Sequence, residues 1–128
     1  MSKTKIDWAK APSAEDFEAA TRYLSLIFSE AECKSLLGSL RAAHKIVHAS
    51  KDLLRASNLP LLPREDSHVD EDLKRIHKRK SLSPVLLVAG DMRRGIPLIV
   101  ADGYHRICAL CYVDEDQPVD CRMARLPA

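Results

Sequence analysis

The stretch Pro97-Leu-Ile-Val-Ala-Asp-Gly-Tyr-His-Arg106 decides the fold of this 128-residue chain. It begins with a continuous apolar run, which is typical of a strand buried on both faces of a sheet. Gly103 then permits a backbone conformation that other residues resist. A helix is predicted from Tyr104 to about Val113, so the stretch predicts a buried strand that turns directly into a helix.

This turn also has the chemistry of an anion-binding site. The first amide N–H groups of a helix have no partner inside it, and the helix dipole places partial positive charge there. His105 and Arg106 add side-chain donors at the same end, and an arginine can bind a phosphate through two parallel hydrogen bonds. The residues therefore predict a phosphate site at the start of this helix.

Asp102 and Arg106 each have a second interpretation. Asp102 is placed to hold a Mg²⁺ ion that bridges phosphates, but it could instead cap the helix. Arg106 could bind phosphate, or it could pair with Asp102 or Glu115. If Arg106 serves the ligand, its replacement by alanine should abolish ligand binding and leave the fold nearly intact.

The rest of the chain predicts further strands and helices around this turn. The run Pro84–Ala89 predicts a second buried strand, and Val119–Arg125 predicts a last one. A helix from about Glu15 to Phe28 follows the capping pattern at Ser13. The same pattern at Ser29 opens a longer helical stretch to about Ser57, with a bend or break near Gly38 as an alternative. Leu59–Leu62 predicts a strand or extended segment, and a weaker helical pattern covers Val69–Lys80.

Length and composition indicate a single domain. Residues 1–12 predict a flexible N-terminal arm, from which Trp8 could dock back on the body, and residues 13–128 predict the domain. No signal-peptide pattern and no apolar run long enough to cross a membrane occurs in the sequence, which favours a cytoplasmic protein. The four cysteines should then be reduced.

The net charge of +2 is too small to indicate nucleic acid by itself. Residues 74–80, KRIHKRK, nevertheless contain five Lys or Arg in seven positions. They predict either the solvated end of a helix or a basic rim that attracts an anionic ligand. His68 and His77 lie near this segment and could line the mouth of such a site.

Two groups of residues have metal-compatible spacing. Cys108 and Cys111 form a C-x-x-C pair, but their surroundings predict the middle of a helix, which favours packing in the core over metal binding. His44 and His48 stand four residues apart on the predicted helix. Because no glutamate follows His44, the metalloprotease pattern is absent, and a surface pair is favoured.

The segment from Leu59 to Leu126 resembles the ParB/sulfiredoxin-like superfamily. The similarity covers five elements in order: Leu-Pro-Leu-Leu-Pro-Arg64 as a first strand and loop, a helix through Ile76, Leu-Ser-Pro-Val-Leu-Leu-Val88, the D-G-x-H-R turn with its strand and helix, and the closing strand Val-Asp-Cys-Arg-Met123. The resemblance implies an α+β fold. Its core, residues 59–126, is expected to be a small mixed β-sheet of ParB/sulfiredoxin-like type. The helical part, residues 13–58, lies outside the resemblance and is expected to pack on this sheet or to form a partner surface.

The resemblance also implies a ligand and site residues. Members of this superfamily place the turn on nucleotide phosphates, so Gly103, Tyr104, His105 and Arg106 would contact phosphate. The implied cofactor is a nucleoside triphosphate or diphosphate, and the Mg²⁺ expected at Asp102 from the residues of the turn would accompany it. Tyr104 could also stack on a base, or it could simply pack against the strands.

The chain departs from the better-known members of the superfamily. Tyr104 stands where sulfiredoxins carry their reactive cysteine, so that chemistry is not expected. The helix-turn-helix module of partition proteins is missing after this domain, so sequence-specific DNA binding is not expected either. The kinases of the superfamily use an acidic residue near the first strand, a position that Glu65 or Asp66 could fill.

Two functions from different classes follow. The first is a Mg²⁺-dependent phosphotransferase or nucleotide hydrolase, with Glu65, Asp66 and His105 as candidate catalytic residues. The second is a non-catalytic nucleotide-sensing or partner-binding module, whose N-terminal helices bind a protein partner or form a homodimer. A nuclease is a further alternative, but no acidic metal cluster is evident in the sequence.

Overall fold

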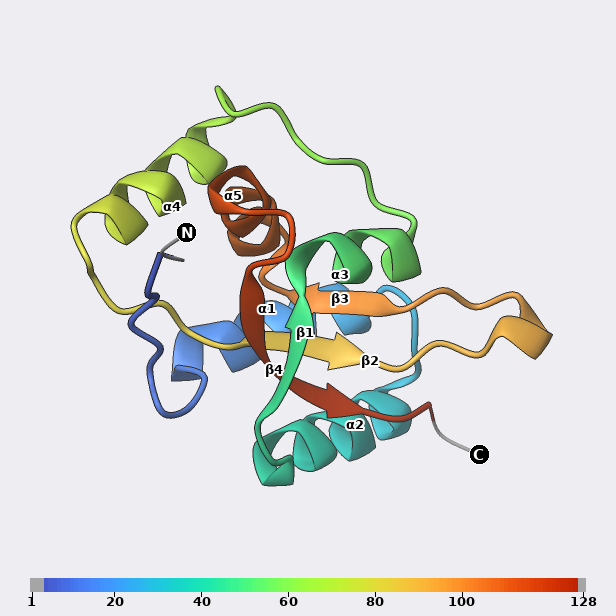
Figure 1. Cartoon of the computed structure of the whole chain (residues 1–128). Helices are drawn as coiled ribbons and strands as arrows, with labels where there is room; N and C mark the ends of the chain where they lie inside the picture. The colour runs from blue at the N-terminus through green and yellow to red at the C-terminus, as the bar shows by residue number, and fades with distance from the viewer. Residues whose placement is uncertain (1–3, 127–128) are drawn as a thin grey trace.

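The structure is a computed structural model that describes residues 4–126. Its elements follow one another as α1 (Ala14–Leu24), α2 (Glu30–Ala42), β1 (Ile46–Ala49), α3 (Ser50–Ser57), α4 (Ser67–His77), β2 (Val85–Val88), the 3-10 turn η1 (Met92–Arg94), β3 (Ile99–Asp102), α5 (Tyr104–Val113) and β4 (Pro118–Ala124) (Figure 1). No helix among these residues has the length and apolar character needed to cross a membrane.

The four strands form one mixed sheet in the order β1-β4-β2-β3. β2 runs antiparallel to β3 and parallel to β4, and β1 runs antiparallel to β4. The last strand in sequence therefore lies inside the sheet, between β1 and β2. Ile46 pairs with Cys121 on one side of β4, and Val85 pairs with Cys121 on the other.

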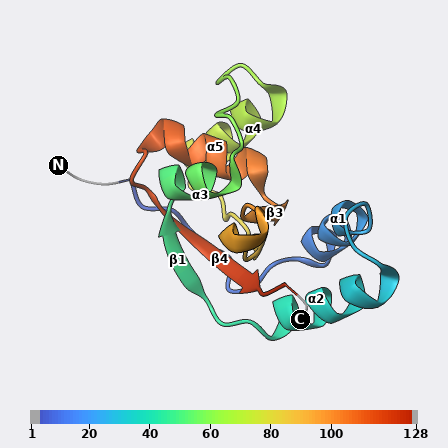
Figure 2. The same cartoon turned by 90° about the vertical axis from the view of Figure 1, so that its right-hand side faces the viewer.

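Helices cover both faces of the sheet (Figure 2). Alternate residues of a strand point to opposite faces. Val85 and Leu87 accordingly pack with α3, α4 and α5, whereas Leu86 and Val88 pack with α1 and α2. Every residue of β2 is buried, which explains why the sequence of this strand is a continuous run of apolar residues. The expected α+β chain, with a small mixed sheet and N-terminal helices packed on it, is confirmed.

The prediction of one helical stretch from Ser29 to about Ser57 is wrong for the middle of this range. α2 continues through Gly38 without interruption, ends at Ala42, and is followed by β1 and then α3. The β-branched residues Ile46 and Val47 pair with β4, and this tertiary pairing overrides the helical pattern. His44 and His48 therefore do not share a helix, because His44 follows α2 and His48 lies on β1.

The run Leu59–Leu62 is extended and forms no strand, so the first strand that the resemblance implied is not at this position. Proline has no N–H to donate to a sheet ladder, and this run contains Pro60 and is followed directly by Pro63. Two phenols hold it instead. Tyr104 Oη donates to the Pro60 carbonyl at 2.5 Å, and Tyr112 Oη donates to the Leu62 carbonyl at 2.7 Å.

The N-terminal segment contacts the body of the domain. The Ala9 N–H donates to the Leu82 carbonyl, and the Leu82 N–H donates to the Asp7 carbonyl, both at 2.8 Å. Trp8 packs against the core on the α5 side of the sheet, as its expected docking requires. Residues 1–3 of the expected arm and residues 127–128 of the expected domain lie outside the described residues.

Candidate functional site

The strand-to-helix turn has the geometry that its sequence predicts. β3 ends at Asp102, Gly103 has a φ of +109°, and α5 starts at Tyr104. A Cβ atom on Gly103 would lie 2.5 Å from Cγ1 of Val85, a separation that side chains do not tolerate. Glycine is thus required here both for its backbone conformation and for close packing on β2.

The N-terminus of α5 carries no side-chain cap. By contrast, Ser13, Ser29 and Asp66 cap α1, α2 and α4 through hydrogen bonds to first-turn amides. The first backbone bond that closes α5 runs from the Ile107 N–H to the Gly103 carbonyl. The amides of the preceding first turn have no partner within the helix. The alternative that Asp102 caps this helix is therefore wrong.

Arg106 is held by groups of the protein itself. Its Nη1 donates to the Ser83 carbonyl at 2.6 Å and to the Pro84 carbonyl at 3.3 Å. Its Nη2 pairs with the carboxylate of Asp102 and lies 3.4 Å from Oδ1 of Asp16. The pairing of Arg106 with Asp102 was one of the two alternatives for this side chain. The Arg106 side chain is only 12% exposed, and its contact with Asp16 links α1 to the turn after β3.

The two carboxylates on Arg106 have opposite pKa shifts. Burial raises the pKa of Asp102 to about 6, and the nearby Asp16 carboxylate adds to the rise, although Arg106 opposes it. Burial also acts to raise the pKa of Asp16, but the hydrogen bond from the Ser13 amide and the charge of Arg106 outweigh it and lower that pKa. Asp16 therefore holds the charge more firmly, and Asp102 is the carboxylate that takes up a proton first.

A cleft of about 490 Å³ opens beside the turn, between α1 and α4. Asp102, Gly103, His105 and Arg106 line it, so four residues of the predicted site are brought together. The ring of His68, from the first turn of α4, faces the ring of His105 with 4.8 Å between centroids. Imidazole groups from two helices thus stand together at the cleft.

The cleft walls are acidic. Five carboxylates line it, against the guanidinium groups of Arg75 and Arg106. Among them, burial raises the pKa of Asp72, while the charges of Arg106 and His105 act in the opposite direction. A bare phosphate would be repelled by this surrounding charge, so an anion would enter most favourably with a bound cation.

Glu65, Asp66 and Tyr104 do not line this cleft. Asp66 caps α4 by accepting from the His68 and Val69 amides at 2.9 and 3.1 Å, and these bonds lower its pKa. Glu65 is exposed in the loop before α4. Tyr104 packs against the core and directs its hydroxyl to Pro60, which corresponds to the packed alternative.

The polar groups at the turn are carboxylates, imidazoles and the open amides at the start of α5. Among residues 4–126, no group of three or more His, Cys, Asp or Glu side chains is arranged to hold a metal ion. Mg²⁺ commonly binds through one or two carboxylates together with substrate phosphates. Asp102 and Asp16 can supply such carboxylates only if Arg106 gives up part of its contact with them.

The cysteines pack in the interior. Cys108 and Cys121 lie in the core cluster between the sheet and α5, Cys33 lies in the cluster under α2, and all four thiols are free. Burial raises the pKa of Cys121 to about 12, so its thiolate is not populated at neutral pH.

Sequence reasoning assigned no site role to four of the five carboxylates that line the cleft, Glu15, Asp16, Glu71 and Asp72. Asp16 was identified as part of a helix cap, and it does cap α1, but its carboxylate also reaches Arg106. Asp72 and Arg75 lie on the face of α4 that borders the cleft. Their spacing matches one face of a helix, but nothing in the sequence shows that this face meets the turn after β3.

The fold and site define a class: a mixed α/β domain with an uncapped helix start, a glycine turn and an acidic cleft. We compared the chain with protein-family models, with curated proteins and with solved structures. None of the three comparisons gave a match.

Proposed function

We propose that this protein is a domain of the ParB/sulfiredoxin-like type that binds the phosphates of a nucleotide at the N-terminus of α5. The observation that carries the proposal is the uncapped first turn of α5, which opens beside a cleft of about 490 Å³. Backbone amides that lack a partner at a helix start bind phosphate oxygens well. The four free thiols suit a reducing compartment, and we place the protein in the cytoplasm.

The nucleotide enters as its magnesium complex. Five carboxylates around the cleft disfavour a bare triphosphate, but they favour a ligand that brings Mg²⁺ with it. The amide and the ring of His105, which lines the cleft beside Gly103, would contact phosphate. Asp102 would contact the metal, and Arg106 would position Asp102 rather than act as the main phosphate ligand.

A nucleotide series in a thermal-shift experiment tests this binding. A ligand at 100 times its dissociation constant adds about 2.7 kcal/mol to the free energy of unfolding. We expect stabilisation of several degrees by magnesium with ATP, CTP or GTP, or with the matching diphosphates, and none by Mg²⁺ alone. His105→Ala should reduce the shift, whereas His44→Ala, an exposed histidine far from α5 in sequence, should leave it unchanged. No shift with any nucleotide would contradict the proposal.

Turnover decides between the two kinds of function. As a phosphotransferase or nucleotide hydrolase, the protein would use His105 at the turn, and Asp72 would replace Glu65 and Asp66 as the candidate base because it lines the cleft. Phosphate release, or transfer to small hydroxyl compounds, would be measured with each nucleotide that binds. Release that disappears in Asp72→Asn, with binding retained, is the result expected of an enzyme.

One observation favours a sensing module without turnover. Arg106 joins the turn to α1 through Asp16, so a ligand that draws Asp102 or Arg106 away would loosen the contact with an N-terminal helix. Binding without turnover, accompanied by faster amide hydrogen exchange in α1, would support this function. The surface of α1 and α2 would then contact a second copy or another protein.

A further inference from the structure

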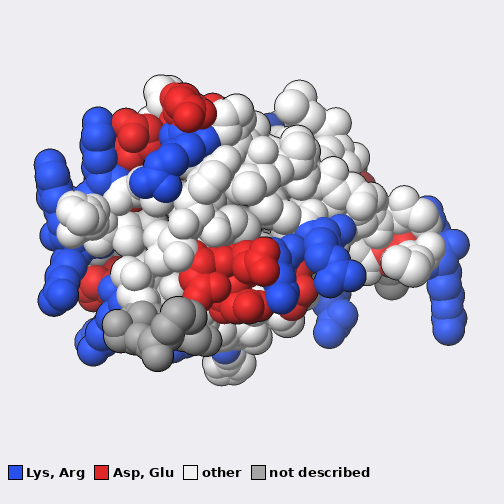
Figure 3. All heavy atoms as spheres, turned by 45° about the horizontal axis from the view of Figure 1, so that its top comes forward, with Lys and Arg blue, Asp and Glu red and all other residues white. Residues whose placement is uncertain are grey.

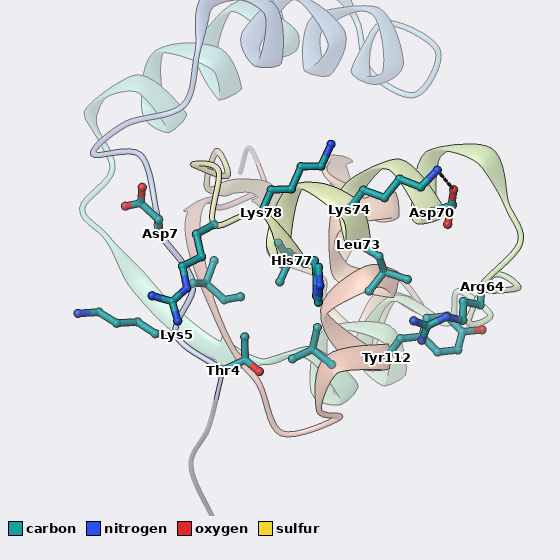
Figure 4. A pocket seen from close by; sticks show the side chains of 14 residues that line it. Thr4, Lys5, Asp7, Arg64, Asp70, Leu73, Lys74, His77, Lys78 and Tyr112 are labelled. Atoms are coloured by element: carbon teal, nitrogen blue, oxygen red, sulfur yellow. Dashed lines mark ion pairs between the residues drawn. The ribbon is translucent and has the colours of Figure 1, made fainter.

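A second and larger groove lies on the other side of α4, between that helix and the N-terminal segment (Figure 4). Its volume is about 1210 Å³. It shares no lining residue with the cleft beside the turn. It takes no part in the function proposed above.

The groove is basic, in contrast to the acidic cleft. Five Lys or Arg side chains line it, against the carboxylates of Asp7 and Asp70. Lys74 is paired with Asp70 at 3.0 Å, but Lys5, Arg64, Lys78 and Arg79 are exposed. The basic run at residues 74–80 therefore contributes to a rim, and a cation from the N-terminal segment faces it.

The cations are spread along the groove rather than gathered at one point. In Figure 4, Lys5 lies at one end, Lys78 lies along one wall, and Arg64 lies at the opposite end. Figure 3 shows blue side chains projecting beyond the C-terminal end of α4, at the left of the molecule. A row of separated, exposed cations suits a ligand whose negative charges repeat along its length.

The floor between the cations offers apolar and ring surfaces. Leu73 and His77 lie in the middle of the groove, and Tyr112 lies beside Arg64. The Arg64 guanidinium lies 5.9 Å from the centroid of the Tyr112 ring and covers its face. Planar side chains of this kind stack on unpaired bases, whereas an acidic peptide has no group that requires them.

We propose that this groove binds single-stranded nucleic acid without sequence specificity. The phosphates would follow the exposed lysines and arginines, and one or two bases would lie against His77 and the Arg64–Tyr112 pair. A double helix keeps its bases stacked inside, so it would meet only the rim and bind less tightly than a single strand.

Fluorescence anisotropy with a labelled oligouridine of about 15 nucleotides, long enough for a site of this kind, tests the proposal. Each phosphate contact with a single strand contributes about −0.7 to the slope of log K against log salt, so three or four contacts give about −2 to −3. K5E/K78E should weaken binding about tenfold or more, because two cations of the groove become anions. If that variant does not fold, K5Q/K78Q takes its place, with a smaller loss.

The matched control is R93E/R94E. Arg93 and Arg94 are exposed on η1, outside the groove, and the net charge changes by the same amount. Loss confined to K5E/K78E, with weaker binding of the duplex of the same sequence, supports the proposal. Equal loss in both variants, a slope near zero, displacement by polyglutamate as effective as by RNA, or no binding by the unaltered protein would overturn it.

Discussion

Replacement of Arg106 by alanine is the most informative single change. The sequence alone predicts that the variant loses its ligand and keeps its fold, but the contacts of Arg106 predict a substantial loss of stability. The side chain is 12% exposed, and its two carboxylate partners are 15% and 17% exposed. Alanine would remove the bonds to the Ser83 and Pro84 carbonyls and leave both carboxylates without their cation.

The size of the effect follows from burial. Breaking a buried ion pair by removing one partner costs about 3–5 kcal/mol, whereas an exposed pair is worth about 0–1 kcal/mol. Asp102 has a pKa of about 6 and can take up a proton when Arg106 is absent, which limits the cost. We therefore expect Arg106→Ala to lower the free energy of unfolding by about 3 kcal/mol and Tm by about 10 °C.

Urea unfolding followed by circular dichroism measures this loss. Arg55→Ala is the control, because Arg55 pairs with Asp52 on the surface with side chains 81% and 54% exposed. That variant should lie within about 0.5 kcal/mol of the parent. Arg106→Lys keeps the charge but not the planar fork, and should fall between the two. If Arg106→Ala lowers the free energy of unfolding by less than about 1 kcal/mol, Arg106 does not hold α1 against the turn.

The turn and its carboxylate give two further predictions. Gly103→Ala should lower the free energy of unfolding, measured in urea, by about 2–4 kcal/mol, because its Cβ would overlap Val85 at a positive φ. Gly38→Ala is the control: Gly38 lies in an open position on α2, and alanine there should raise the free energy of unfolding by about 0.5–1 kcal/mol. Similar values for both variants would contradict the packing described for Gly103. Asp102 binds its proton more tightly in the folded state than in the unfolded state. As pH rises from about 4 to about 6, the free energy of unfolding should therefore fall by about 2 kcal/mol more in the parent than in Asp102→Asn. If the free energies of unfolding of the two proteins change in parallel with pH, Asp102 is not the group that titrates.

The elements that sequence predicted well are those determined by neighbouring residues. Ile99–Val113 is a strand, a glycine turn and a helix in one contiguous stretch, and all three form where the pattern places them. Ser13 and Ser29 form the capping boxes that their spacing indicates. The caps and the glycine turn are set by neighbouring residues, and β3 pairs with β2, the strand that precedes it in the chain.

The elements that sequence missed depend on distant partners. β1 is a strand because Ile46 meets Cys121, far along the chain, and no local pattern contains that pairing. The cleft shows the same limit, because Asp16 and Asp102 are far apart in the chain and come together around the guanidinium of Arg106. Asp66 had the right chemistry for a catalytic role, but the neighbouring amides of α4 use its carboxylate.

The position of β4 has a consequence for synthesis of the chain. β4 leaves the ribosome after β1, β2 and β3, yet it lies between β1 and β2 and bonds to both. Until residues 118–124 are available, β1 has no partner strand, and β2 has one free edge along an entirely apolar segment. A nascent chain therefore carries two exposed edges that can pair with other chains, and its protection from aggregation depends on how quickly β4 is inserted between them.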